Sequence, residues 1–264
     1  MKGNSVCRLC LQEKKLIKKS HLIPDFMYQD LYDQSHRIYS LVIDAWRKNI
    51  LLKTRNPTGE YEGGILCTDC ENKVLGLYES YASKAMYGGR FSRKEKNPVC
   101  KKYRNSEGPD FTRVDNIDYA KFKLFLLSIL WRASISSREF FAEVNLGPHE
   151  ETLRQMILSG NPGNVEDFPV LVATYAQEKK LPLDVITNPQ LKVDGNGDSF
   201  YVVLISAFIY SFFLPTANGY PHMVKDCTIT PENKMNIIHL PYQEALAILG
   251  SLTGIGEKLD SAIK

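Results

Sequence analysis

The first third of the chain combines short apolar stretches with amphipathic helical patterns. Between residues 71 and 87, apolar side chains recur at spacings of three and four, which predicts a helix with one buried face. These side chains are Val74, Leu77, Tyr78, Tyr81 and Ala85. Gly88-Gly89 follows, and glycine is common just after the last turn of a helix, so we expect the helix to end there.

Shorter elements are predicted before this helix. Helical spacing after Asp25, a candidate N-cap, predicts a helix over residues 25–33. Apolar runs between polar turn residues are typical of short strands. Such strands are expected over residues 16–17 and 38–43, and the basic residues 48–55 are predicted to form either a second strand or an arm.

The second half opens with a strongly apolar helix from Tyr119 to Trp131, which we expect to be buried on most sides. A short helical piece over 137–141 and a helix from Pro148 to Gly160 follow, the latter with Pro148 near its first position. The remaining pattern predicts strands over 169–175, 184–186, 190–193 and 235–240, a turn over 194–198, one long buried strand over 200–213 and a closing helix over 241–249.

These elements predict an α+β protein with three segments. Residues 1–89 form an N-terminal domain, and residues 114–264 form a domain of helices packed on a mostly antiparallel sheet. Residues 90–113 are basic and polar and contain two prolines, so they are predicted to be a linker, with a loop facing nucleic acid as the alternative. The second domain lacks paired acids and phosphate-binding loops, which favours a regulatory or oligomerising role.

Charge is unevenly distributed along the chain. The net charge of the 264 residues is +3, but residues 1–110 contain 20 Lys/Arg and 13 Asp/Glu, an excess of +7. Such an excess favours a polyanion such as nucleic acid as partner, although a solvated basic surface stays an alternative. The candidate phosphate contacts are Lys14, Lys15, Lys18, Lys19 and Lys73.

The sequence favours a cytoplasmic protein without a membrane partner. The chain begins without an apolar leader segment, and the longest apolar run, over residues 201–214, is too short to span a bilayer as a helix. Four of the six cysteines form C-x-x-C pairs, which suits a reducing compartment better than a disulfide framework.

The two C-x-x-C pairs are the strongest chemical signal. Cys7, Cys10, Cys67 and Cys70 can supply four thiolates to a tetrahedral Zn²⁺ site. Buried thiols or a redox pair are alternatives, but a redox pair needs only one C-x-x-C. The long spacer between the pairs adds little to the entropy of closing the site. A cysteine turn, a strand pair and a helix starting at the second cysteine pair together predict a treble-clef zinc module.

A family resemblance rests on these motifs. The cysteine pairs, Ser-His-Leu-Ile-Pro at residues 20–24 and Ile-Leu-Cys-x-x-Cys-Glu-Asn-Lys at residues 65–73 resemble the four-cysteine form of the HNH endonuclease superfamily. The resemblance covers residues 7–85. It implies a structural zinc on the four cysteines and His21 as the general base that deprotonates the attacking water.

Three positions depart from the family pattern. The family has an acidic metal ligand just before the histidine, where this chain has Ser20. It has His or Asn after the last cysteine, where this chain has Glu71, a carboxylate able to bind Mg²⁺ or Mn²⁺. Its central Asn is replaced by Glu62 or is absent. The alternatives are a structural His21 that hydrogen-bonds the zinc loop and Glu71 as an ordinary acid of a first helical turn.

The resemblance therefore implies a metal-dependent endonuclease acting on nucleic acid, by analogy in bacterial genome defence. Two other functions stay open: a zinc protein that binds nucleic acid without cleaving it, and a protein-interaction module that zinc stabilises. The remaining histidines are expected at the surface or in the core. They are His36, His149, His222 and His239.

Overall fold

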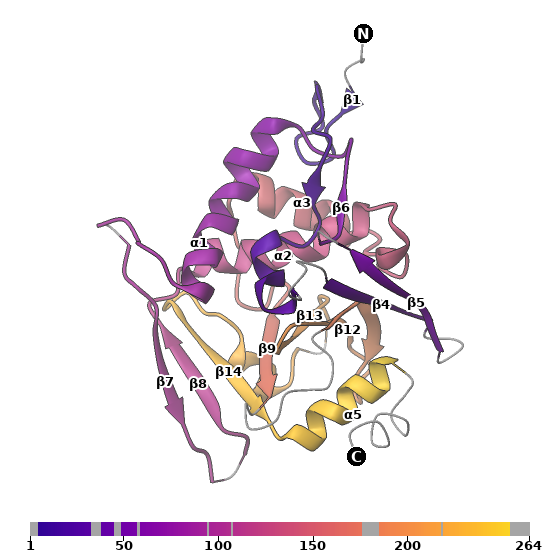
Figure 1. The fold of residues 1–264 in the computed structure, drawn as a ribbon. Helices are drawn as coiled ribbons and strands as arrows, with labels where there is room; N and C mark the ends of the chain where they lie inside the picture. Colours follow the sequence, from indigo (N-terminus) through magenta and orange to yellow (C-terminus); the bar gives the residue numbers. More distant parts are fainter. Residues whose placement is uncertain are drawn as a thin grey trace.

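The structure is a computed structural model that describes residues 5–32, 38–44, 49–56, 59–93, 95–106, 108–175, 185–217 and 219–253. Within these residues, ten strands form one large sheet (Figure 1). The strands are β4 (Ile38–Asp44), β5 (Asn49–Asn56), β7 (Val99–Tyr103), β8 (Phe111–Asp115), β9 (Val170–Tyr175), β10 (Val185–Thr187), β11 (Gln190–Val193), β12 (Ser199–Ile205), β13 (Phe208–Phe213) and β14 (Lys234–Leu240).

The strand order is β5-β4-β10-β12-β13-β9-β14-β8-β7, with β11 also paired to β12. β4 with β10 and β9 with β14 are parallel neighbours, and the other neighbours along this order are antiparallel. The predicted α+β class with a mostly antiparallel sheet is confirmed. Six expected strands are present, and each observed end lies no more than one residue from the predicted one. They were expected over residues 38–43, 48–55, 169–175, 184–186, 190–193 and 235–240, of which residues 48 and 184 lie outside the described part.

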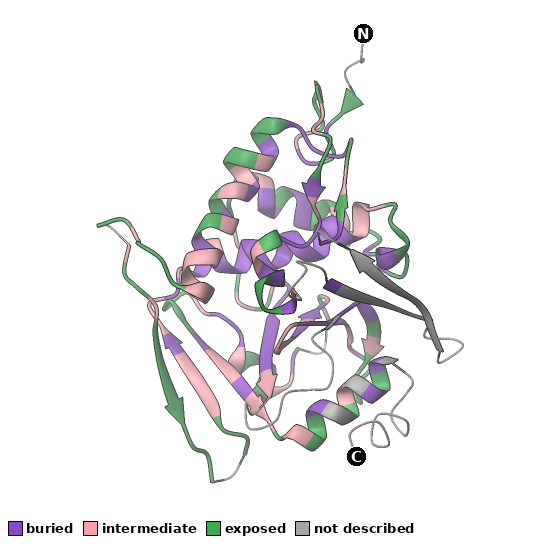
Figure 2. Cartoon of the chain, viewed as in Figure 1, coloured by how far each residue is buried: buried purple, intermediate pink, exposed green. Residues whose placement is uncertain are grey.

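Helices cover both faces of the sheet. Val203 and Tyr210 of the sheet share a hydrophobic core with helices α1 (Gly76–Tyr87), α2 (Tyr119–Ile135) and α3 (His149–Ser159). Val202 and Ile209 point to the other face, where they share a second core with α4 (His222–Cys227) and α5 (Tyr242–Thr253). Figure 2 shows α2 almost entirely buried, as its apolar sequence predicts.

The run over residues 200–213 is a hairpin and not one long strand. β12 and β13 pair antiparallel from Phe200↔Phe213 to Ile205↔Phe208, and Ser206 takes a left-handed conformation with φ of 56° at the turn. Both strands lie between the two helical layers, so most of their side chains are apolar. Ser206 is a single polar residue at the turn, and one serine in an apolar run does not indicate a hairpin.

The predicted basic linker also folds in part. Residues 99–103 form β7, which pairs with β8 at one end of the sheet, and the β7 side chains are exposed. One hydrophobic core contains Cys7, Leu75, Phe125 and Met235, so side chains from both predicted domains pack together. The boundaries at residues 89 and 114 stay a prediction.

Other elements differ in detail from the prediction. The helix expected over 25–33 is a 3₁₀ helix, η1 (Asp25–Leu31), with Pro24 and not Asp25 at its N-cap; residue 33 lies outside the described part. The helix expected over 71–87 begins as a π-helix, η2 (Cys70–Leu75), and continues as α1 up to Gly88, whose φ is 83°. The piece at 137–141 is a 3₁₀ helix, η3 (Glu139–Phe141). In the described part of the chain, every helix is too short or too polar to cross a membrane.

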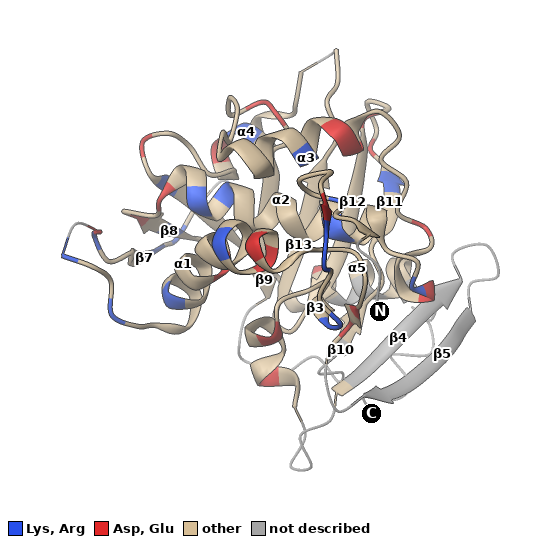
Figure 3. Ribbon diagram, turned by 90° about the horizontal axis from the view of Figure 1, so that it is seen from above, with Lys and Arg blue, Asp and Glu red and all other residues tan. Residues whose placement is uncertain are grey.

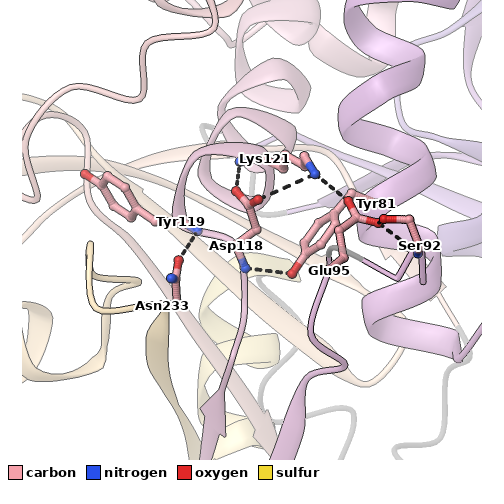
Figure 4. Close-up of polar contacts among 7 residues, drawn as sticks. All are labelled: Tyr81, Ser92, Glu95, Asp118, Tyr119, Lys121 and Asn233. Carbon is pink, nitrogen blue, oxygen red and sulfur yellow. Dashed lines mark hydrogen bonds and ion pairs between the residues drawn. The ribbon is translucent and has the colours of Figure 1, made fainter.

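A polar network fixes the start of α2 against α1 (Figure 4). The Asp118 carboxylate caps α2 by accepting from the backbone N–H of Lys121 at 2.9 Å. The Tyr81 hydroxyl of α1 accepts from the backbone N–H of Asp118, and the Lys121 ammonium pairs with Glu95 and Asp118. Further bonds join Ser92 to Glu95 and the Tyr119 N–H to Asn233. The network thus ties together four segments that are distant in sequence.

Asp118→Ala is expected to lower the free energy of unfolding by about 1 kcal/mol, because it removes the N-cap acceptor of α2. Urea unfolding followed by circular dichroism measures the change. Asp118→Asn is the matched control, since asparagine caps helices about as well as aspartate. If alanine and asparagine destabilise equally, the loss comes from the ion pair with Lys121 and not from the cap.

Candidate metal centre and the adjoining histidine

The first cysteine pair lies in a tight hairpin between β1 (Ser5–Val6) and β2 (Glu13–Lys14). The N–H of Cys7 donates to the carbonyl of Gln12 at 3.0 Å, and the N–H of Leu11 donates to the carbonyl of Cys7 at 2.9 Å. Leu11 has a φ of 58°, which reverses the chain after Cys10. The turn thereby directs both sulfurs of the pair toward one point.

The second pair lies where the chain enters η2. The backbone N–H of Cys67 donates to the Sγ of Cys7 at 3.3 Å, and Leu16 forms a β-bridge with Cys67. The N–H of Glu71 donates to the carbonyl of Cys67 at 3.0 Å, which starts the helix at the second pair. Backbone contacts therefore hold the two pairs together despite the long spacer.

The four Sγ atoms of Cys7, Cys10, Cys67 and Cys70 lie within 4.8 Å of one another. The Sγ atoms of Cys10 and Cys67 are 4.0 Å apart, close to the ~3.8 Å expected between sulfurs of a tetrahedral site with Zn–S bonds of about 2.3 Å. The structure thus brings together the four predicted ligands in a group that can hold a metal ion. Among the described residues it is the one such group of three or more His, Cys, Asp or Glu.

Burial makes this cluster a poor place for free thiolates. Cys7, Cys67 and Cys70 are buried and Cys10 is half-buried. Burial, reinforced by the neighbouring thiols, raises the pKa of the Cys70 thiol. A divalent cation would reverse this effect, because thiolates coordinated to a metal lose their protons. The donor set of four sulfurs fits a soft or borderline ion such as Zn²⁺.

His21 lies on β3 (Ser20–His21), which pairs with β6 (Tyr61–Glu62). Its Nε2 is 4.0 Å from Asp25 Oδ1, and within the described residues this nitrogen has no hydrogen-bond partner. Burial is the main cause that lowers the pKa of His21, and Asp25 acts against it. The imidazole is therefore neutral at pH 7.

Ser20 and Glu71 are in direct contact. The buried Ser20 hydroxyl donates to Glu71 Oε2 at 2.8 Å. Burial raises the pKa of Glu71, while the Ser20 bond and the nearby Arg132 oppose this rise. The carboxylate thus lies at the residue preceding His21. Side chains of adjacent strand residues point to opposite faces, so Glu71 follows Ser20 toward the interior.

Arg132 on α2 supports the histidine strand, and the sequence reasoning missed it. Its side chain is fully buried, and Nη1 donates to the carbonyl of His21 and to Glu79 Oε1, each at 2.7 Å. Arg132 Nε also donates to the carbonyl of Ser128 at 3.2 Å. Arg132 is the single charged residue in the apolar stretch 124–133 of α2, and this is the signal that could have indicated a buried partner.

Glu62 is occupied by other contacts. Its carboxylate accepts from the Ser136 hydroxyl at 2.7 Å, and from the backbone N–H and hydroxyl of Ser137 at 3.0 and 2.6 Å. These bonds fix the end of α2 to β6. The position that the resemblance assigns to a central Asn therefore has a structural role.

The predicted phosphate-binding lysines differ in their surroundings. Lys14 and Lys73 both pair with Asp69, at 3.2 and 2.7 Å, and these bonds lower the pKa of Asp69. The Lys19 ammonium lies 4.7 Å from the centre of the Tyr61 ring, and Lys15 and Lys18 are exposed. Figure 3 shows basic and acidic positions intermixed on helices α1 and α3.

Among the described residues, the other histidines are not part of the cysteine cluster. His149 contacts Phe168, His222 is exposed on α4, and His239 contacts Thr112. His36 lies outside the described residues.

Comparisons with protein-family models, with curated proteins and with solved structures find no match to this chain.

Proposed function

We propose that the protein is an HNH-like, metal-dependent endonuclease in which a structural zinc on the four cysteines positions His21 as general base. The observation that carries this proposal is the contact of Ser20, the residue that precedes His21, with Glu71. Positions 20 and 71 are the two that the family resemblance makes metal ligands. They are 51 residues apart in sequence and meet at 2.8 Å.

The chemistry of His21 supports the assignment. A neutral imidazole can accept the proton of a water molecule as the water oxygen adds to phosphorus and the bond to the leaving oxygen breaks. Because burial lowers the pKa of His21 from its ordinary value of 6.5, the basic form persists below that pH. Arg132 holds the His21 carbonyl, which fixes the strand that carries the ring.

The described residues offer a modest set of ligands for a catalytic cation. Glu71 supplies one carboxylate and Ser20 one hydroxyl. Mg²⁺ sites often use only one or two carboxylates, with water and substrate phosphate completing the shell. When bound there, Mg²⁺ or Mn²⁺ would stabilise negative charge on the phosphate.

A protein that binds nucleic acid without cleaving it is the second candidate. Two observations favour it. His21 Nε2 is buried without contact to solvent, and side chains of adjacent strand residues point to opposite faces, so the imidazole is directed away from the Ser20–Glu71 contact. Exposed Lys15, Lys18 and Lys19 beside β3 would still contact phosphates. Binding through such contacts weakens steeply as salt rises.

The test compares cleavage of plasmid, single-stranded DNA and RNA with Mg²⁺ or Mn²⁺. His21→Ala is expected to lower the rate by about 10²–10⁴-fold, the usual effect of losing a general base. Glu71→Gln is expected to abolish turnover or to raise the metal concentration required. The rate of the unchanged protein should fall with acidity only below pH 6.5.

Two matched variants control for the substitutions. His222→Ala removes an exposed histidine on α4, and Glu139→Gln neutralises an exposed acid on η3. Both should cleave like the unchanged protein, and all variants should keep their zinc. Equal cleavage by His21→Ala and the unchanged protein would refute the assignment of His21. Binding without cleavage by the unchanged protein would favour the second candidate.

A further inference from the structure

A cleft of about 800 Å³ lies on the α1–α3 side of the sheet, where β7, β8, β14, β9 and β13 come together. Its volume falls within the range of about 300–1,000 Å³ that small-molecule sites usually have. The residues that line it are Lys102, Tyr103, Arg104, Asp110, Thr112, Thr174, Tyr175, Phe208, Ile237 and His239. None of them belongs to the cysteine cluster or to the His21 site.

Strand register determines which of these side chains share the cleft face. Lys102 pairs with Thr112, and Thr112 pairs with Ile237. In the adjacent row, Phe208 pairs with Thr174 and Thr174 with His239. Residues directly opposite on neighbouring strands project to the same side of a sheet, so the two rows form one continuous wall.

The polar part of this wall is arranged for an anion. Lys102, Arg104 and His239 provide cationic or proton-donating groups, and the Thr112 hydroxyl lies 2.7 Å from His239 Nε2. Asp110 is the acid in the lining, and its Oδ1 already accepts from the backbone N–H of Asn105. Burial, with a smaller contribution from Lys102, lowers the pKa of His239, and Asp110 opposes this change.

The apolar part of the wall lies next to these groups. Phe208 and Ile237 are half-buried and pack on the main core with part of their surface directed to the cleft. An aromatic ring can stack on a flat ligand, and stacking on a nucleic-acid base tolerates any base. A ligand with both an anionic group and a flat apolar group would match the two parts.

We propose that this cleft binds an unpaired nucleotide, with its phosphate at Lys102, Arg104 and His239 and its base against Phe208 and Ile237. The nucleotide is either free or part of a single strand. The site does not depend on the nuclease proposal, because it shares no residue with the His21 site. It also gives the basic residues of the 90–113 segment a function on a folded hairpin.

The experiment is calorimetric titration of the full chain with AMP, with inorganic phosphate and with a single-stranded dA10 oligonucleotide, without added Mg²⁺. Lys102→Glu is expected to weaken binding of the nucleotide about tenfold or more, because it replaces a charge-assisted contact by repulsion. Phe208→Leu keeps the apolar packing but removes the ring, and is expected to weaken AMP about fivefold or more while leaving inorganic phosphate unchanged.

Lys101→Glu is the matched control. Lys101 is the neighbouring residue on the same exposed strand, and it pairs with Arg113 on the opposite face. The Lys101→Glu variant has the same net charge as the Lys102→Glu variant. If the cleft is the site, the affinity of Lys101→Glu for the nucleotide should stay within about twofold of that of the unchanged protein. An equal loss for Lys101→Glu and Lys102→Glu would overturn the proposal, since it would indicate general attraction to a basic surface.

The two ligands separate the two sources of nucleotide. Binding of AMP identifies a free nucleotide site, whereas binding of dA10 alone identifies a strand site. Binding of neither, or equal affinity for AMP and inorganic phosphate, would overturn the proposal. His21→Ala should leave all these affinities unchanged, so a failure of the nuclease proposal would not affect this test.

Discussion

Replacing Cys67 with serine is expected to release one zinc ion per chain and to unfold the N-terminal part of the protein. Cys67 is 1% exposed and contributes both a sulfur to the cluster and a backbone N–H to Cys7. Zinc binding contributes about 10–16 kcal/mol to the folding of small zinc modules. That is comparable to the whole stability of a typical domain.

Elemental analysis of the purified protein measures the metal, and limited proteolysis with circular dichroism measures the unfolding. Cys100→Ser is the matched control, because Cys100 is exposed on β7 and lies outside the cluster. It should keep both metal and fold. A metal-free unchanged protein that is nevertheless folded would show that the four cysteines are only buried thiols.

Replacing Arg132 with methionine is expected to lower the free energy of unfolding by about 3–5 kcal/mol. Methionine fills much of the volume of arginine, so the loss reports the polar contacts more than a cavity. The variant leaves the Glu79 carboxylate and the His21 carbonyl without their donor. Removing one partner of a buried pair is costly because the other partner stays desolvated and unpaired.

Urea unfolding measures this loss, and two further variants interpret it. Arg8→Met breaks an ion pair with Glu150 in which the Arg8 side chain is 53% exposed. Such a surface pair contributes about 1 kcal/mol or less, so little change is expected. The double variant Arg132→Met, Glu79→Gln should lose less stability than the sum of the losses of the two single variants, because it removes the Glu79 charge that Arg132→Met alone leaves unpaired. Full additivity would contradict the pairing.

Local sequence patterns predicted α2 and α3, whereas the short helix α4 was not predicted. The apolar run from Tyr119 gives α2, and Pro148 and Gly160 flank α3 as predicted. Pro and Gly act through their own backbone preferences, so these boundaries are encoded locally. The same holds for the turn at 194–198, where Asp194 Oδ1 accepts from the N–H groups of Asn196 and Asp198.

Some errors have one cause, which is that a segment's neighbours in space override its own pattern. The sequence did not indicate the turn at Ser206, because both flanking strands are central in the sheet and their apolar residues read as one continuous run. β7 has a polar sequence typical of a linker, yet it is ordered by pairing with β8 along its whole length. An edge strand whose side chains are exposed leaves little hydrophobic periodicity to detect.

The candidate sites show the same division. The spacing of the cysteines was enough to predict the four-sulfur cluster, because each C-x-x-C turn is a local structure that directs both of its sulfurs to one point. Only the tertiary structure decided that Arg132 reaches the His21 carbonyl across 111 residues of sequence, and that Ser20 meets Glu71. It also placed Lys102 and His239 in one cleft. Such contacts depend on how helices and strands pack, and sequence periodicity reports which face of an element is buried but not which residue will lie against it.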